Sequence, residues 1–163
     1  MFSLLKNTEF QTLFKDDLKT LNNCFKIFDK ILYLKLPFLF NYLNLHQIKV
    51  EYYLSPWLIT LFTNVCHFHD EIPKILFKIW DEFLLNGFNS LFINFLVLLS
   101  LHAKEILKKE GDKLLAFFIN DVNISKMFKD ENYELWINER KKFNINEEEI
   151  KIIKDLILIE NSN

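Results

Sequence analysis

The segment Tyr53-Leu-Ser-Pro-Trp57-Leu-Ile-Thr-Leu-Phe62 decides which fold this chain can adopt. Ser55-Pro56 is a helix-start signal, because a serine side chain can cap free backbone N–H groups and proline presets the first helical residue. The apolar residues that follow recur at helical spacing and share one face: Trp57, Leu58, Leu61 and Phe62. Large aromatic residues at this spacing are usually buried, so we expect Trp57 to lie in the core of a helical protein.

A second block, Ile79-Trp80-Asp81-Glu-Phe-Leu-Leu-Asn-Gly87, follows at a short distance. We expect its helix to start between Asp70 and Pro73 and to run to about Leu85, because acidic residues favour a helix N-terminus. Gly87 should end it by accepting a left-handed conformation, and Ser90 should cap the next helix. Trp80 is expected in the core, and Asp81 is expected to accept hydrogen bonds that hold neighbouring helix ends.

The longest and most apolar helix is expected from Leu91 to about Lys109. A helix that is apolar around most of its circumference belongs at the centre of a bundle. Its apolar run, Leu91–Leu101, is well short of the ~20 residues that a membrane-spanning helix needs. We therefore interpret it as a buried core helix and expect no direct membrane span.

Local signals also place the helices at the two ends of the chain. Apolar residues recur at helical spacing from Glu9 to Asn22, and a second helix is expected around Phe25–Leu32. Pro37 fits the first turn of a third helix, where its missing N–H is harmless. Near the other end, Asn146 and Glu149 form a capping-box pattern that predicts a helix from Glu147 to about Ile159.

Composition supports an all-α chain with a compact core. The 163 residues are 50% hydrophobic but contain only two glycines and three prolines, too few for the many turns of a β-sandwich or barrel. A formal net charge of −2 gives no electrostatic footprint for nucleic acid, so none is expected as a partner. Cys24 and Cys66 are expected to be reduced thiols in a cytoplasmic protein.

In their order and spacing, residues of both blocks and their flanks resemble the TBC domain of Rab GTPase-activating proteins. The resemblance covers roughly residues 5 to 110, and its residues are Phe38 to Leu43, His46, Tyr53, Pro56, Trp57, Leu61, Phe62, Pro73, Ile79, Trp80, Asp81, Leu84, Leu85, Gly87, Leu91 and Phe92. It implies an all-α, multi-helix orthogonal bundle like the C-terminal lobe of that domain, spanning residues 1–110. Residues 111–163 are expected to form a helical extension packed on this lobe.

The same resemblance implies a Rab-type small GTPase as partner. The family supplies an arginine that stabilises charge on the transferred phosphoryl group and a glutamine that orients the attacking water. Neither the family's Ile-x-x-Asp-x-x-Arg block nor its Tyr-x-Gln block occurs in this sequence. The sole arginine, Arg140, and the two glutamines, Gln11 and Gln47, lie outside such blocks, so no catalytic residue is assigned.

Seven residues are called the signature residues below, and each is expected to have a structural role: Tyr53, Pro56, Trp57, Phe62, Trp80, Asp81 and Gly87. The leading hypothesis is the C-terminal portion of a TBC-type Rab GTPase-activating protein, which regulates membrane traffic and reaches endomembranes through its partner. Such a protein activates a partner enzyme and is not itself an enzyme. The alternative is a catalytically silent TBC-like interaction or scaffold module.

Three further expectations concern binding. If helices of a larger domain are missing, the surface they would cover should be apolar and should favour self-association or pairing.

The segment Cys66-His67-Phe-His69-Asp70-Glu71 offers ligand types for a metal but lacks paired spacing, so no metal is assigned. The only glycines, Gly87 and Gly111, exclude a phosphate-cradling loop, so no cofactor is expected and any GTP would be carried by the partner.

Overall fold

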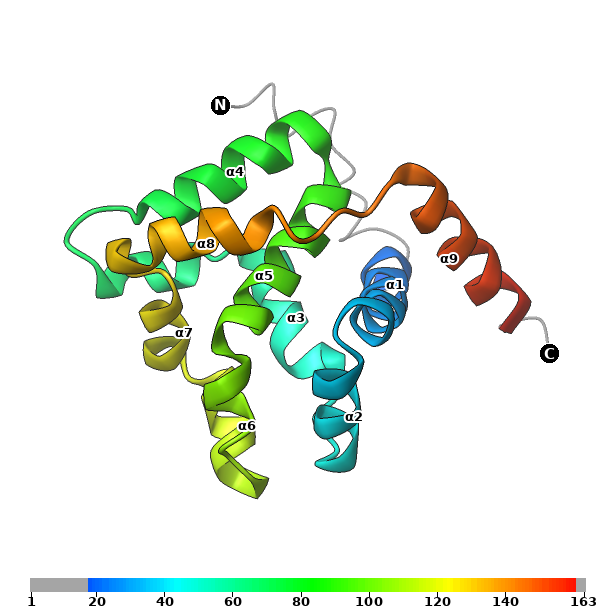
Figure 1. Ribbon diagram of the computed structural model, residues 1–163, viewed down its shortest axis with the longest axis horizontal. Coiled ribbons are helices and arrows are strands. Elements are labelled where there is room, and N and C mark those ends of the chain that lie inside the picture. The colour runs from blue at the N-terminus through cyan, green and yellow to red at the C-terminus, as the bar shows by residue number, and fades with distance from the viewer. Residues whose placement is uncertain (1–17, 161–163) are drawn as a thin grey trace.

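The computed structural model describes residues 18–160, and these residues form helices and turns without any strand (Figure 1). The helical elements are α1 (Lys19–Lys35), α2 (Pro37–Leu45), α3 (Val50–Thr60), the 3-10 helix η3 (Thr63–Phe68), α4 (Lys74–Asn86), α5 (Phe88–Ile106), α6 (Gly111–Ile119), α7 (Asp121–Met127), the 3-10 helix η4 (Asp130–Asn132), α8 (Tyr133–Arg140) and α9 (Glu147–Glu160). The predicted all-α bundle is confirmed.

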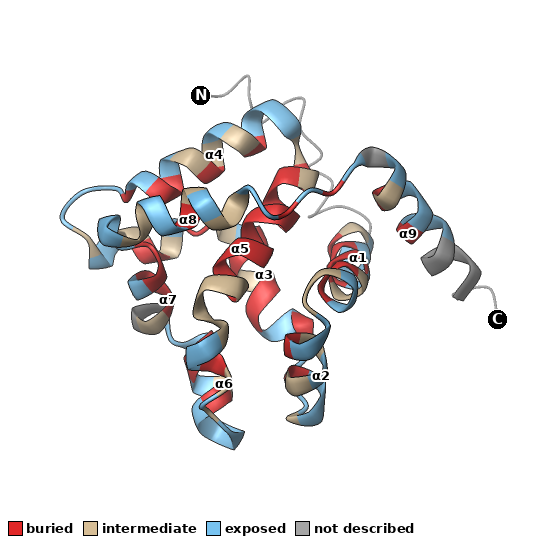
Figure 2. Cartoon of the chain, viewed as in Figure 1, coloured by how far each residue is buried: buried red, intermediate tan, exposed pale blue. Residues whose placement is uncertain are grey.

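Helix α5 is the centre of the molecule, as its composition predicts. It runs through the middle of the bundle, with α4 and α8 packed against it (Figures 1 and 2). An unbroken run from Ser90 to Leu99 is buried, including the polar Ser90 and Asn94. The helix is long and apolar, but no helix within residues 18–160 has the length and hydropathy to span a bilayer.

The predicted start of α3 at Ser55-Pro56 is wrong. The helix begins at Val50, and Pro56 lies inside it, where it cannot donate to the carbonyl of Tyr52. The earlier turn is retained because Val50, Tyr53 and Leu54 are buried on the same face as Trp57. Burying those additional apolar side chains offsets one missing backbone hydrogen bond.

The predicted boundary near Asn22 is also wrong, because α1 is continuous across that position. Helix α1 runs from Lys19 to Lys35 and buries Leu21, Phe25 and Phe28 along one stripe. Most of the predicted Glu9–Asn22 helix lies outside the described residues. The prediction for Pro37 is confirmed, since it occupies the first position of α2.

The C-terminal helix α9 starts at the predicted capping box. Asn146 Oδ1 accepts a hydrogen bond from the N–H of Glu149 at 2.7 Å, and Glu149 Oε2 accepts one from the N–H of Asn146 at 3.1 Å. Lys35 Nζ of α1 also donates to Glu149, over 2.8 Å, and Ile150 and Ile153 are buried. The helix is therefore attached to α1 by one ion pair and a small apolar contact.

One apolar core extends across residue 110. Leu114, Phe118 and Phe128 belong to the same cluster of buried side chains as Trp57 and the α5 residues. On α8, Trp136 is completely buried in that cluster, although its neighbour Leu135 is 58% exposed. The later helices thus supply part of the core, and the division into residues 1–110 and 111–163 stays a prediction.

Trp136→Ala should lower the free energy of unfolding by about 3–5 kcal/mol, because it empties a fully buried site. Leu135→Ala, on the same helix but at an exposed position, should change it by no more than about 0.5 kcal/mol. Chemical denaturation followed by circular dichroism measures both. Similar small effects for the two variants would contradict a core shared with α8.

The contact of α9 should weaken in acid. The hydrogen bonds from Lys35 and from the Asn146 backbone lower the pKa of Glu149 below its ordinary value of 4.5. The charged carboxylate therefore stabilises the fold above about pH 4.5, and this contribution is lost as the pH falls through the folded-state pKa. The melting temperature of the wild type should exceed that of Glu149→Gln near pH 7, and the difference should disappear in acid; a pH-independent difference would contradict this assignment.

Candidate functional site

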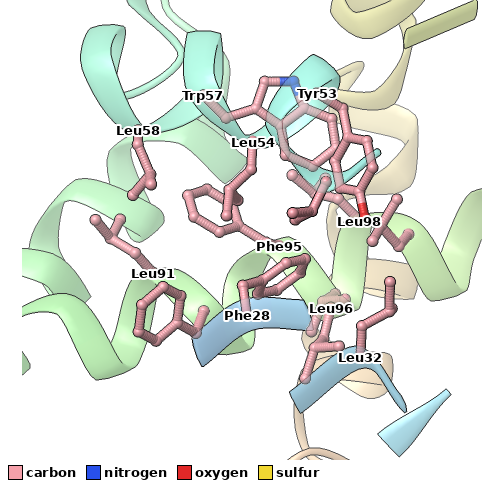
Figure 3. Packing of buried hydrophobic residues seen from close by; sticks show 14 of the residues in the cluster. Phe28, Leu32, Tyr53, Leu54, Trp57, Leu58, Leu91, Phe95, Leu96 and Leu98 are labelled. Atoms are coloured by element: carbon pink, nitrogen blue, oxygen red, sulfur yellow. The ribbon is translucent and has the colours of Figure 1, made fainter. Parts of the chain in front are cut away.

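The first block of signature residues forms an aromatic junction between α3 and the rest of the core. Figure 3 shows Tyr53 and Trp57 of α3 facing Phe95 of α5, with Phe28 of α1 beside it. The Trp57 ring lies 5.2 Å from Phe62 and 5.7 Å from Phe95, measured between ring centroids. Tilted and edge contacts of this kind add to the hydrophobic gain of burial. These side chains are therefore placed to hold helices together.

Burial makes the Tyr53 hydroxyl unsuitable for proton transfer. Tyr53 is 1% exposed, and its ring lies 4.9 Å from that of Phe118. Burial raises the pKa of Tyr53 above its ordinary value, and the nearby carboxylates of Asp29 and Glu51 raise it further. The phenol thus stays neutral at physiological pH and contributes as an aromatic core residue.

A left-handed turn ends α3, and it positions Phe62. Leu61 has φ 49° and Phe62 has φ 64°, which is unusual for two bulky residues in succession. Phe62 is completely buried, and its ring lies 4.9 Å from that of Phe128. Such backbone conformations cost about 1–3 kcal/mol each and persist where the surroundings determine them. The buried ring is the contact that determines this turn.

Trp80 supports the same turn from α4. Its indole Nε1 donates a hydrogen bond to the carbonyl of Leu61 over 2.8 Å. The residue is only partly buried, so the expectation of a core position holds for Trp57 but not fully for Trp80. A side chain with an apolar body and a polar edge suits this boundary position, where it occupies the open carbonyl at the end of α3.

Within residues 18–160, Asp81 does not make the predicted hydrogen bonds to neighbouring helix ends. Asp81 is exposed and makes no hydrogen bond or ion pair with the part of the chain that the structure describes. The adjacent Glu82 has that role: its Oε2 accepts from Arg140 Nε at 3.2 Å and from Asn94 Nδ2 at 3.1 Å. Position on the helix decides this, since Glu82 faces α5 and α8 and Asp81 faces solvent.

Arg140 is fully engaged in this polar cluster. Besides its ion pair with Glu82, its Nη1 donates to the carbonyl of Phe143 over 3.1 Å. Glu139, the residue before Arg140, accepts one hydrogen bond from Ser100 Oγ and another from Lys142 Nζ, both over 2.6 Å. Burial raises the pKa of Glu139, but these two hydrogen bonds outweigh it, and the net pKa is lowered. Two charged contacts therefore attach α8 to α4 and α5.

Sequence reasoning missed Glu82 and Asn94, although one signal was present. Asn94 stands in the middle of the most apolar run of the chain, and a buried amide needs partners. Its Nδ2 also donates to the carbonyl of Ser90, while its Oδ1 has no partner within the described residues. The identity of the partner, Glu82, depends on how α4 crosses α5.

Gly87 makes the turn between α4 and α5 with φ 67° and ψ −156°, a conformation open almost only to glycine. The prediction that Gly87 ends α4 is confirmed. The prediction that Ser90 caps the next helix is wrong, because α5 already starts at Phe88 and Ser90 Oγ donates to the Gly87 carbonyl over 2.7 Å. Burial of Phe88 favours this earlier start.

The Cys66–Glu71 segment contains the residue types that could bind a metal. The His69 ring lies 3.2 Å from the carbonyl oxygen of Ser125, and burial raises the pKa of the Cys66 thiol. Within residues 18–160, no group of three or more His, Cys, Asp or Glu side chains is arranged to hold a metal ion.

Comparison with known families agrees with this architecture. The family model described as "Rab-GTPase-TBC domain" matches residues 1–107, a partial segment of that domain. All seven signature residues fall within the match. No curated protein matches the chain.

Glu82→Ala should destabilise the fold by about 1–3 kcal/mol, because it removes the carboxylate that the half-buried Arg140 and the buried Asn94 share and leaves each with a single backbone acceptor. Asp81→Ala is the matched control and should change stability by less than about 0.5 kcal/mol. Urea denaturation of both variants distinguishes them. Equal losses would mean that the adjacent carboxylates are interchangeable.

Proposed function

We propose, since this chain belongs to the Rab-GTPase-TBC domain family, that it is the C-terminal portion of a unit that activates a Rab-type GTPase. In this role the chain contributes to binding the partner GTPase. The partner GTPase carries the nucleotide and performs hydrolysis. Support comes from the family match over residues 1–107 and from the all-helical core. The chain would act in the cytoplasm and reach endomembranes through its partner.

The catalytic part of this proposal rests on the contacts that Arg140 makes inside the fold. An arginine finger must project from its own protein to reach the transferred phosphoryl group in a partner's site. Arg140 instead contacts Glu82 and Phe143, and its side chain is 24% exposed. Residues 1–107, the matched segment, contain no arginine at all. The arginine that stabilises the transition state would therefore come from outside these 163 residues.

The glutamine would have the same origin. Gln47 lies in the turn between α2 and α3 with φ 57°, exposed and outside a Tyr-x-Gln block. Gln11 lies outside the described residues. The contribution of this chain would then be the core that holds the GTPase-facing surface, and the signature residues other than Asp81 would serve that core.

A second candidate function is a catalytically silent TBC-like interaction or scaffold module. Large apolar side chains that remain exposed favour it: Phe38 and Leu45 on α2 are 72% and 76% exposed, and Leu85 on α4 is 82% exposed. Side chains of this size and exposure are typical of surfaces that pair with another protein. They also support the expectation of self-association.

Single-turnover GTP hydrolysis by a panel of Rab proteins tests the main proposal. The chain alone should leave the hydrolysis rate unchanged. Adding an upstream TBC segment that carries the arginine and glutamine blocks, fused or in trans, should accelerate hydrolysis by about 10³-fold or more, the effect of an arginine finger. Arg140→Lys is the matched control and should keep that acceleration, because lysine preserves the charge opposite Glu82.

Acceleration by the chain alone that disappears in Arg140→Lys would overturn the structural role of Arg140. Rab binding without acceleration in either arrangement would favour the silent module. Failure to bind any GTP-loaded Rab, with or without the upstream segment, would contradict the main proposal.

A further inference from the structure

Helix α4 is apolar on both its inner and its outer side. Its inner side is buried in the core through Ile75, Leu76, Ile79 and Phe83. On the outer side Phe77 is 51% exposed, Leu84 46% and Leu85 82%, and the Phe77 ring lies 5.9 Å from the partly buried Trp80. Large apolar side chains that gather on an exposed face often mark a contact surface. We call Phe77, Lys78, Trp80, Asp81, Leu84 and Leu85 the outer face of α4.

Two opposite charges, Lys78 and Asp81, lie on this outer face. Lys78 and Asp81 are three residues apart, about one helical turn. Neither forms an ion pair with any residue in the described range 18–160, whereas Lys74, one turn before Lys78, lies 3.6 Å from Asp130. Within the face, Trp80 lies at the edge next to α3, and Glu82 lies just beyond the opposite edge, next to α8. The face thus combines apolar side chains with one cation and one anion that have no ion-pair partner among residues 18–160.

We infer that a second copy of this chain covers the outer face, with the two α4 helices antiparallel about a two-fold axis. An isologous interface requires a surface that complements itself. If the axis passes between Ile79 and Trp80, Lys78 lies at the same height as the partner's Asp81, and the reverse pair forms by symmetry. Phe77 then lies two residues, about 3 Å along the axis, from the height of the partner's Leu84. Both charges and apolar contacts are satisfied in this one register.

Charge is the reason for choosing this face over that of α2. Helix α2 also exposes Phe38 and Leu45, but its nine residues contain no charged side chain. It therefore has nothing that would fix the orientation or the register of a partner. The 13 residues of α4 span only about 20 Å, so the interface is small and the dimer should form at high protein concentration. The inference does not depend on any role in GTP hydrolysis.

Sedimentation equilibrium of the full chain over a concentration series measures the dissociation constant of the dimer. Variants with reversed charges on α4 then test the proposed interface. Lys78→Asp and Asp81→Lys should each weaken dimerisation at least about tenfold, because each places like charges opposite one another twice. The double variant carrying both reversals should restore the wild-type dissociation constant to within about threefold. Lys104→Asp, on an exposed position near the far end of α5, is the matched control and should leave it unchanged. The three positions lie outside the buried core, and a thermal melt of each of the four variants verifies its folding.

A wild type that stays monomeric throughout the series would overturn the proposal. Single reversals without effect would remove the outer face of α4 from the interface. Loss in both single variants without recovery in the double variant would exclude the antiparallel register. Because Rab activation is measured separately, failure of that function and failure of this pairing are distinguishable.

Discussion

The burial of α5 on all sides is the constraint on which the rest of the structure depends. Its residues from Leu91 to Leu99 are excluded from water, and so α4, α8 and the aromatic junction of α3 must pack around it. Removing so much apolar surface from water is the main favourable term in folding. The helices of residues 111–160 complete this enclosure, which explains why Trp136 of α8 is as deeply buried as Trp57 of α3.

Polar groups inside that enclosure then determine the electrostatics. Asn94 cannot be buried in α5 without partners, and Glu82 of α4 accepts from it. A carboxylate in this position in turn needs a cation, and Arg140 of α8 supplies it. The buried amide of Asn94 is thus linked through Glu82 to Arg140, the only arginine in the chain. The absence of a projecting arginine follows from packing as well as from sequence.

This arrangement relates the two candidate functions. In both of them the buried signature residues Tyr53, Trp57 and Phe62 would support a helical surface, and neither function requires a titrating group in this chain. Tyr53 stays neutral because it is buried, and the Glu139 carboxylate stays ionised because Lys142 and Ser100 donate to it. The two proposals differ in whether residues from elsewhere would join this chain to act on a GTPase. The exposed apolar residues of α2 and α4 are compatible with either.

The amino-acid sequence by itself determined the all-α class, the family and those helix ends that depend on local chemistry. Pro37, Gly87 and the Asn146–Glu149 capping box act through their own backbone or a neighbour three residues away, so their effects can be read without a fold. Tertiary structure alone decided the start of α3, which burial moved past Ser55-Pro56, and the role of Glu82 over Asp81. It also decided that the Trp80 indole would meet the Leu61 carbonyl. These outcomes depend on which helices cross and at what angle, because burial and long-range hydrogen bonds join residues that the sequence keeps apart.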